Sequence, residues 1–229
     1  MDEQISIIQD NTIIKEITDA TAINNPIPSS DPYWNYASTP LISADLAPSL
    51  ASNPETIGWI QVPGTNIDYP FVQTKDNDFY LHHSFNRAWN SAGWIFLDYR
   101  NNPNLSDKNQ LLYAHGRADG SMFGSLKNVL TADWQSHPEF HVVKISTSST
   151  NSLWQVFSTY EIPVTTDYLA TTFASANDFT DFINLIKNRS AYNFHTEINN
   201  SDRIITLSTC SDNEHRIVIH ARLVKTVAK

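Results

Sequence analysis

A single cysteine stands where a strand-like pattern stops and a polar loop begins. Cys210 ends the apolar, β-branched run Arg203-Ile-Ile-Thr-Leu-Ser-Thr-Cys210, and a second strand-like run starts at Arg216. Two such runs joined by the five residues 211–215 predict an antiparallel hairpin. Cys210 and Arg216 then lie on neighbouring strands about 5 Å apart. A thiol beside a fixed cation has a lowered pKa and can hold an anion, which suits a cysteine nucleophile.

The alternative for a lone cysteine is a structural role. In a strand, cysteine is most often a small buried hydrophobe without reactivity. The preceding Ser208 and Thr209 favour reactivity, because they are small and polar and leave room around a sulfur atom. A thiol with a pKa of about 8.5 is mostly protonated at neutral pH, so a nucleophilic Cys210 also needs a base or a cation.

Among the eight histidines, His115 has the sequence context of such a base. It closes the run Gln110-Leu-Leu-Tyr-Ala-His115, and the loop that follows contains Gly116, Gly120 and Gly124, half of the six glycines in the chain. A histidine at a strand end, followed by a loop whose backbone can take unusual conformations, is well placed to donate and accept protons. The alternative is a structural histidine with satisfied hydrogen bonds.

These residues resemble the signature of a known enzyme family. Leu207-Ser-Thr-Cys210 with Arg216 downstream, and Tyr113-Ala-His115-Gly-Arg upstream, are similar to the catalytic motifs of the sortases, the cysteine transpeptidases of Gram-positive bacteria. Residues 57–72, 78–82 and 92–98 resemble class B sortases in particular. The resemblance extends from Ile57 to Val224, with the motifs in the order of the family.

The resemblance implies a role for each candidate residue. Cys210 is the expected nucleophile, His115 the proton donor and acceptor, and Arg216 the cation that stabilises the transition state. Arg222 is the rival arginine, but the family position lies at the start of the last strand, which favours Arg216. Ser208 and Thr209 are candidates for substrate contact or for the oxyanion site, where backbone N–H groups near Thr209 would contribute.

The resemblance also implies the reaction and its partners. Cys210 attacks the threonine carbonyl of a C-terminal sorting motif on a secreted protein, and an amine resolves the thioacyl-enzyme. That amine belongs to peptidoglycan, to its lipid-linked precursor or to a pilin lysine. The expected location is the extracellular face of the membrane, or the cell wall, of a Gram-positive bacterium. Sortases are held there by an N-terminal membrane anchor, which we expect upstream of Met1.

This chemistry requires neither an organic cofactor nor a metal ion. His137 and His141 are four residues apart, but Pro138 argues against an uninterrupted helix that would present both to one metal. No cluster of carboxylates suggests calcium. We therefore expect no metal site.

Composition agrees with one globular domain. The chain has 229 residues, of which 41% are hydrophobic, enough for one substantial core. The net charge is −9, from 15 basic and 24 acidic residues, which argues against nucleic acid bound through a basic face. One cysteine cannot form an intrachain disulfide. No apolar run reaches the length of about 18 residues that a membrane-spanning helix needs.

The first 50 residues differ in character from the rest. They contain seven acidic residues and one basic residue, Lys15, and so carry −6 of the net charge. Isoleucines between positions 5 and 17 make an uneven helical pattern over residues 2–21, and a proline-rich linker follows at 24–32. We expect residues 1–50 to form helices packed on the domain or a stalk, and residues 51–229 to form the catalytic domain.

From residue 57 the pattern changes to short strands separated by polar turns. Eight runs are expected, at 57–62, 67–72, 94–98, 110–115, 140–146, 153–162, 203–210 and 216–227. A helix interrupts them, because Ser175-Ala-Asn-Asp178 resembles a capping box and an apolar stripe follows at Phe179, Phe182, Ile183 and Ile186. The stripe predicts core packing. The fold class is therefore mainly β with added helices: a closed eight-stranded sortase-type β-barrel, N-terminal helices, and a helix inserted before the strand of Cys210. In class B sortases, the inserted helix forms one wall of the substrate groove.

Three other functions are compatible with parts of this pattern. A hydrolytic cysteine protease would share Cys210 and His115 but would not require Arg216. A pilin-polymerising sortase would use the same residues with a different amine. A non-catalytic surface binding module would bury Cys210 in its core.

Overall fold

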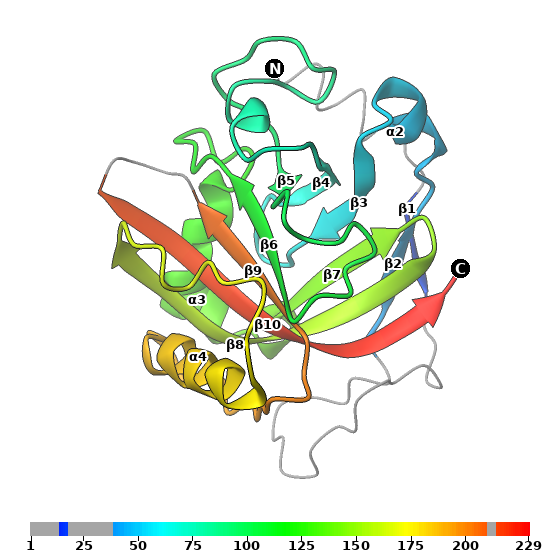
Figure 1. Cartoon of the computed structure of the whole chain (residues 1–229). Coiled ribbons are helices and arrows are strands. Elements are labelled where there is room, and N and C mark those ends of the chain that lie inside the picture. Colours follow the sequence, from blue (N-terminus) through cyan, green and yellow to red (C-terminus); the bar gives the residue numbers. More distant parts are fainter. Residues whose placement is uncertain (1–13, 18–38, 210–213) are drawn as a thin grey trace.

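The computed structural model describes residues 14–17, 39–209 and 214–229, and a closed barrel of eight strands dominates them (Figure 1). The barrel order is β10-β8-β7-β3-β4-β5-β6-β9. Its strands are β3 (Thr56–Gln61), β4 (Asp68–Val72), β5 (Phe96–Leu97), β6 (Asn109–Ala114), β7 (Val142–Thr147), β8 (Thr150–Pro163), β9 (Ile204–Thr209) and β10 (His215–Ala228). Each overlaps one of the eight expected runs, and the predicted barrel is confirmed.

Two strand pairs are parallel, β4 with β5 and β6 with β9, and the other neighbours in the barrel are antiparallel. β9 and β10 pair antiparallel from Ile204↔Arg222 to Ser208↔Val218, as the hairpin predicted around residues 211–215 requires, and residues 210–213 lie outside the described part of the chain. β8 and β10 form the longest pair and continue past the end of β9, as far as Pro163↔His215. The start of β10 therefore rests on β8 beside the end of β9.

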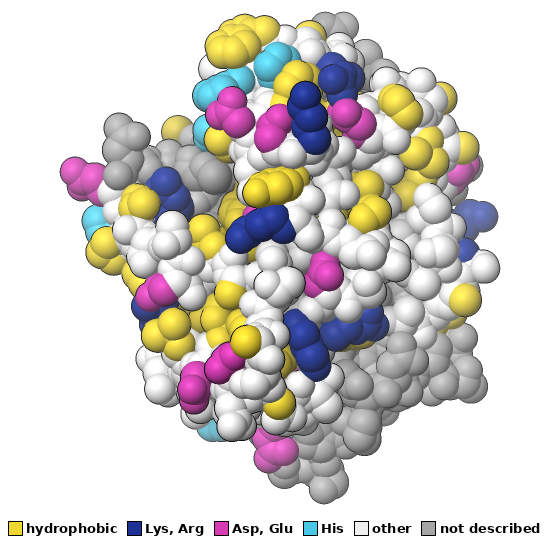
Figure 2. All heavy atoms as spheres, viewed as in Figure 1, with side chains coloured by type: hydrophobic (Ala, Val, Ile, Leu, Met, Phe, Trp, Pro, Cys, Tyr) yellow, Lys and Arg dark blue, Asp and Glu magenta, His cyan; other side chains and the backbone are white. Residues whose placement is uncertain are grey.

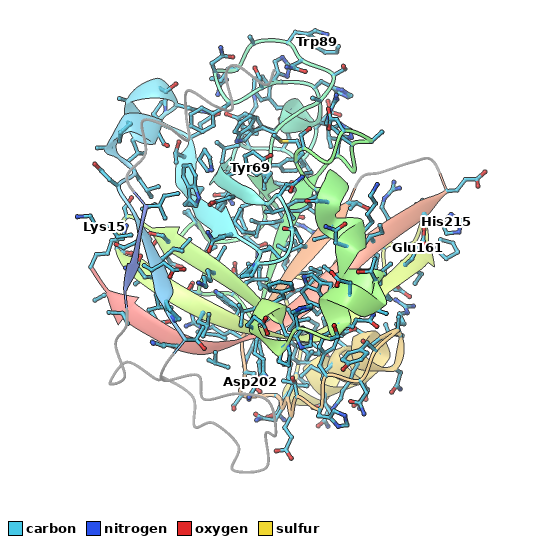
Figure 3. All side chains as sticks on the ribbon, turned by 180° about the vertical axis from the view of Figure 1, so that it is seen from behind. Lys15, Tyr69, Trp89, Glu161, Asp202 and His215 are labelled. Atoms are coloured by element: carbon cyan, nitrogen blue, oxygen red, sulfur yellow. The ribbon has the colours of Figure 1, made fainter. Side chains whose placement is uncertain are left out.

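Large apolar side chains fill the barrel. Trp59, Trp94, Trp154, Phe71 and Phe96 are all at most 1% exposed. Burial of one such side chain contributes on the order of 2–3 kcal/mol to folding. Figure 3 shows the difference between inside and outside, since Tyr69 lies within the packed body while Trp89 projects from its edge.

The inserted helix is present as α4 (Ala176–Asn188), and its stripe is core, as predicted. The Ser175 hydroxyl accepts a hydrogen bond from the Asp178 N–H at 3.2 Å and caps the first turn. The buried stripe packs, together with Phe157, Tyr160, Tyr168, Ile204 and Val218, into a second apolar cluster. α4 thus covers the face of β8, β9 and β10 that carries Tyr160, Ile204 and Val218, and this face is called the outer face below.

The described part of the N-terminal segment corrects one prediction. Ile14–Ile17 form a strand, β1, which pairs antiparallel with β2 (Leu41–Ala44), where the isoleucine spacing predicted a helix. Isoleucine is β-branched and suits a strand when a partner strand is available. The rest of the predicted helix lies outside the described residues. A short helix, α2 (Ala47–Ser52), follows β2. The domain boundary at residue 51 stays a prediction.

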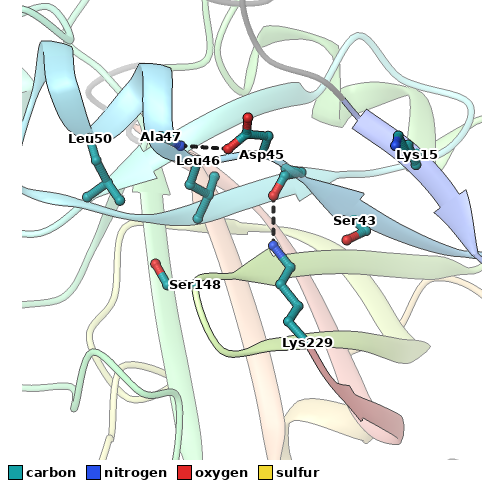
Figure 4. Close-up of a pocket in the computed structure, with 9 residues that line it drawn as sticks. Lys15, Ser43, Asp45, Leu46, Ala47, Leu50, Ser148 and Lys229 are labelled. Atoms are coloured by element: carbon teal, nitrogen blue, oxygen red, sulfur yellow. Dashed lines mark hydrogen bonds between the residues drawn. The ribbon is translucent and has the colours of Figure 1, made fainter.

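Side-chain hydrogen bonds attach the N-terminal strands to the barrel. The Lys144 Nζ on β7 donates to the Glu16 carboxylate of β1 at 3.1 Å, and the Ala44 N–H donates to the Ser146 hydroxyl at 2.9 Å. The C-terminal Lys229 donates through Nζ to the Ala44 carbonyl at 2.7 Å and lines a pocket between β1, β2 and α2 (Figure 4). Burial lowers the pKa of Lys229.

The remaining helices of the described residues are short: η1 (Phe79–Leu81), η2 (Gly124–Leu130), α3 (Ala132–Gln135) and η3 (Pro138–Phe140). Within residues 14–17, 39–209 and 214–229, no helix has both the length and the apolar character needed to cross a bilayer.

A directed chain of hydrogen bonds lies on the outer face. The Tyr160 hydroxyl donates to Nε2 of His220, Nδ1 of His220 donates to Thr206 Oγ1, and Thr206 donates to Asn109 Oδ1, each at 2.8 Å. Burial, with a smaller effect of the Arg189 charge, lowers the pKa of His220 to about 3, so its ring is neutral at pH 7. This series of hydrogen bonds joins β8, β10, β9 and β6, which are the strands that lead to the candidate site.

Candidate active site at the ends of β6, β9 and β10

The ends of β6 and β9 bring two predicted site positions to one edge of the barrel. The two strands run parallel, in a register from Asn109↔Ile204 to Ala114↔Thr209. His115 follows Ala114 directly, and Thr209 is the last described residue of β9. Neighbouring strands lie about 4.8 Å apart, so the ends of β6 and β9, at Ala114 and Thr209, lie side by side. Cys210 lies outside the described residues.

A backbone carbonyl orients the His115 ring. Nε2 of His115 lies 2.8 Å from the carbonyl oxygen of Leu81, at the end of η1. A carbonyl oxygen only accepts, so Nε2 carries the proton of this hydrogen bond. In the neutral ring, Nδ1 is then the nitrogen with the lone pair. The half-buried imidazole therefore has a defined tautomer, in which Nδ1 can act as the base.

The segment that supplies this carbonyl wraps closely around the ring. Gly93 has φ +60°, and a Cβ there would lie 2.4 Å from the Tyr80 carbonyl, 2.9 Å from the Leu81 carbonyl and 3.1 Å from Cδ2 of His115. The Trp94 N–H donates to the Tyr80 carbonyl at 2.8 Å. Only glycine combines this backbone conformation with this close approach.

The base of the segment is itself anchored. The fully buried Tyr80 donates its hydroxyl to the Glu55 carboxylate at 2.5 Å and accepts from the Asn53 side-chain amide at 2.7 Å. Burial, together with the hydrogen bond to Glu55, raises the pKa of Tyr80. The carbonyl that holds His115 is therefore part of a fixed turn.

Arg216 lies at the same edge, on the part of β10 that passes the end of β9. It pairs with Ile162 of β8, and the next residue, Ile217, donates its N–H to the Thr209 hydroxyl at 2.9 Å. The Arg216 guanidinium donates through Nη1 to the His215 carbonyl at 2.9 Å. This half-buried arginine therefore stands where β9 ends.

The hydroxyls of Ser208 and Thr209 are used within the protein. Both residues are at most 2% exposed. The Ser208 hydroxyl is 2.9 Å from the Tyr168 hydroxyl, and the Thr209 hydroxyl accepts from Ile217. These contacts fix the end of β9.

The rival Arg222 is remote from this edge. It lies six residues further along β10, where it pairs with Ile204 at the start of β9. Six residues of a strand span about 20 Å. Its side chain is buried, and its Nε donates to the Gln155 side chain at 3.0 Å.

Comparison with known proteins decides the family. The sortase domain family matches residues 60–224 of the chain. Sortase B of Listeria monocytogenes is 36% identical over 201 residues, which cover 84% of this chain and 80% of that protein. Sortase B of Staphylococcus aureus is 34% identical over 178 residues, which cover 76% of this chain and 72% of that protein. The chain belongs to the sortase family.

The solved structures agree with this assignment. A Bacillus anthracis protein described as similar to sortase B aligns with a TM-score of 0.75 and 33% identity, over 98% of this chain and 94% of that one. The class B resemblance seen in the sequence is confirmed. This sortase is a cysteine transpeptidase, and its family acts on substrates with sorting signals and on amine nucleophiles. The two named relatives come from Gram-positive bacteria.

The sequence predicts candidate side chains for the site but not the groups that hold them in place. The structure brings His115, Ser208, Thr209 and Arg216 to one edge. It adds the Leu81 carbonyl and Gly93, which position His115. A backbone carbonyl leaves no signal in residue type, whereas a glycine inside the Ala92-Gly-Trp motif is a signal of close backbone approach.

Gly93→Ala should lower kcat/KM of this sortase about 100-fold, because the new Cβ pushes against the two carbonyls and displaces the one that orients His115. Peptide-cleavage kinetics, measured beside thermal unfolding, test this. Gly120→Ala is the matched control: Gly120 also has positive φ, at +80°, but the nearest atom to its Cβ is the flexible Asn66 Nδ2 at 3.1 Å. Equal activity losses in the two variants would contradict the prediction.

Proposed function

We propose that Cys210, His115 and Arg216 carry the transpeptidation, with Cys210 as nucleophile. The parallel register Ala114↔Thr209 is the observation that carries this proposal. It supports a nucleophile that follows Thr209 directly in the chain and a base that follows Ala114 directly. The Ile217 to Thr209 hydrogen bond supports Arg216 as the nearby cation. For Ser208 and Thr209 we propose that their side chains fix the end of β9, while backbone N–H groups near Thr209 help to bind the oxyanion.

The first step forms a thioester. The Cys210 thiolate attacks the threonine carbonyl of the sorting motif, and the oxygen takes the negative charge of the tetrahedral intermediate. The Arg216 guanidinium donates to this oxyanion; one such donor is commonly worth about 3 kcal/mol. The protonated Nδ1 of His115 then gives its proton to the leaving amine as the C–N bond breaks.

The second step resolves the thioester. The acceptor amine gives a proton to Nδ1 of His115 as its nitrogen attacks the thioester carbonyl. The new amide forms as the C–S bond breaks, and the thiolate is restored. His115 is thus the acid of the first step and the base of the second, and the Leu81 carbonyl holds the ring for both.

The proposed partners follow from the family. Solved structures similar to this chain include the Staphylococcus aureus sortase B–substrate complex and a sortase B complexed with triglycine. Each has 32% sequence identity to this chain and a TM-score of 0.72. For this chain we propose a secreted protein with a C-terminal sorting motif, cleaved after threonine, as donor. The proposed acceptor is an amine of peptidoglycan or of its lipid-linked precursor, at the extracellular face of the cell membrane.

Cleavage of a library of fluorescent sorting-motif peptides, with and without an amine acceptor, tests the proposal. The unsubstituted protein and Cys210→Ala are compared. We expect cleavage that requires Cys210 and that shifts from the acid to the amide product when hydroxylamine or triglycine is added. A product that stays hydrolytic at every acceptor concentration would favour a cysteine protease. Absence of cleavage, with a native Cys210 that resists alkylation, would contradict the proposed site.

A further inference from the structure

A four-residue segment between β8 and α4 is fastened to the strands of the site. Residues 167–170 cross the front of β9 and reach β6 (Figure 1). The Tyr168 hydroxyl is 2.9 Å from the Ser208 hydroxyl, and the Asn109 side-chain amide donates to the Ala170 carbonyl at 2.8 Å. At the start of the segment, the Asp167 carboxylate accepts hydrogen bonds from both Nη atoms of Arg189, the residue that follows α4, at 2.8 and 2.6 Å.

Arg100, in the turn after β5, makes a further hydrogen bond to residues 167–170. Its Nη2 donates to the Leu169 carbonyl at 3.1 Å. The same guanidinium donates to Asp98 through two parallel bonds, Nε to Oδ1 at 2.9 Å and Nη2 to Oδ2 at 2.7 Å. Such a fork fixes the plane of the guanidinium and therefore the direction in which it meets the carbonyl.

The surroundings of Asp98 hold its carboxylate in place for these two hydrogen bonds from Arg100. Its side chain is 0% exposed, and it also accepts from the Asn77 amide at 2.9 Å and from the Tyr113 hydroxyl at 3.0 Å. Burial alone would raise the pKa of Asp98, but the hydrogen bonds from Arg100 and Asn77 lower it overall. A buried carboxylate with this many donors stays ionised and rigid. Arg100, by contrast, has a side chain that is 40% exposed.

The segment covers the outer face up to the catalytic positions. Ile204 and Ser208 lie on one face of β9 because side chains alternate along a strand, and Tyr113 is the register partner of Ser208. His115 comes two residues after Tyr113. Figure 2 shows hydrophobic and basic side chains side by side in the middle of the surface seen in that view. A peptide bound along it toward His115 would lie against residues 167–170.

We propose that Asp98 and Arg100 are positioning residues for recognition of the sorting motif. Through the Leu169 carbonyl they hold residues 167–170 as a wall of the peptide groove. Leu169 and Ala170, which are half-buried, then present the apolar surface of that wall. The inference rests on the proposed function, since it assumes a peptide that reaches Cys210. Neither residue is assigned a contact with the reacting atoms.

Arg100→Gln tests the inference with the peptide that the unsubstituted protein cleaves best. We expect KM to rise about tenfold, because a charge-assisted tie to the wall is lost, while kcat and the rate of Cys210 alkylation by iodoacetamide stay within about twofold. We also expect weaker discrimination among peptides substituted at single motif positions. Arg100→Lys keeps the charge without the fork and should give the same loss of discrimination.

Arg203→Gln is the matched control. Arg203 also donates to a backbone carbonyl, from Nη1 to Leu105 at 3.0 Å, but it precedes β9 at the end of the strand away from His115. Thermal unfolding of all variants separates folding from recognition. KM and discrimination that match those of Arg203→Gln, or a fall in kcat alone, would overturn the inference. Absence of Cys210-dependent cleavage by the unsubstituted protein would overturn the proposed function as well.

Discussion

Replacement of His115 by glutamine should slow cleavage of a sorting-motif peptide by about 10²–10⁴-fold while the protein stays folded. A glutamine amide can donate to the Leu81 carbonyl, as Nε2 of His115 does at 2.8 Å, so the turn around it keeps its partner. The amide cannot take up or release a proton at neutral pH, which is the function assigned to Nδ1. Steady-state kinetics and thermal unfolding of the variant check both parts of this expectation.

The loss should depend on the leaving group. An amide bond needs a proton on the departing nitrogen, whereas a thioester releases a thiolate that needs none. We therefore expect His115→Gln to lose much less activity on a thioester of the same peptide sequence when hydroxylamine is the acceptor, because hydroxylamine is largely unprotonated at pH 7. Equal losses on the amide and on the thioester would contradict the assignment of His115 as general acid.

His83→Gln is the matched control for this substitution. His83 is another partly buried histidine, on the segment that supplies the Leu81 carbonyl, and its Nδ1 donates to the Phe79 carbonyl at 2.7 Å. It thus makes the same kind of ring-to-carbonyl bond but has no part in the proposed chemistry. A loss of activity comparable to that of His115→Gln would show that disturbance of the segment, and not loss of proton transfer, explains the effect.

Most of the barrel could be predicted because each strand leaves a local signal. The run at 153–162 lies within β8, and the run at 203–210 contains β9, because β-branched and aromatic residues stand between polar turns. β5 fills the smallest part of its expected run: Phe96–Leu97 form the strand inside an expected 94–98, since the Trp94 N–H donates to the Tyr80 carbonyl. The local pattern located the strand, whereas the hydrogen bond from Trp94 to a residue outside the sheet limited its length.

Tertiary context explains what the pattern could not show. Helical spacing of the isoleucines was overridden at Ile14–Ile17, where β2 offers a pairing edge in the register from Ile17↔Leu41 to Ile14↔Ala44. His220 had no recognisable partner in the sequence, because Tyr160 and Thr206 lie 60 and 14 residues away along the chain. Only the folded barrel brings these groups together.

The candidate site likewise combines residues that have a local sequence signal with contacts that depend on the folded protein. His115 and Arg216 were predicted from motifs, and their assignment as catalytic residues stays a prediction. The fork of Arg100 on Asp98 is local in sequence, two residues apart, yet its target, the Leu169 carbonyl, is 69 residues away. The sequence motif Asp98-Tyr-Arg therefore gives no indication of the segment that it holds.

Arg216→Ala should lower kcat/KM by about 10²–10³-fold, which corresponds to about 2.7–4 kcal/mol of transition-state stabilisation. The reason is the charge that develops on the threonine carbonyl oxygen, which a guanidinium at the end of β9 is placed to receive. Arg216→Lys should recover only part of the loss, because a lysine keeps the charge but not the planar set of donors. Peptide-cleavage kinetics of both variants measure the effect.

Two comparisons separate this role from the alternatives. If Arg216 acts mainly on the oxyanion, Cys210 of Arg216→Ala should be alkylated at the rate of the unsubstituted protein once the thiol is fully ionised, since alkylation forms no oxyanion. A shift of the alkylation profile to higher pH that is large enough to explain the whole loss of kcat/KM would instead mean that Arg216 acts by stabilising the thiolate. Arg222→Lys is the control for the rival arginine: its partner Gln155 is buried about 20 Å along the strand, so the change should affect unfolding and spare the activity of the folded protein. An activity loss in Arg222→Lys as large as that in Arg216→Ala would return the catalytic assignment to Arg222.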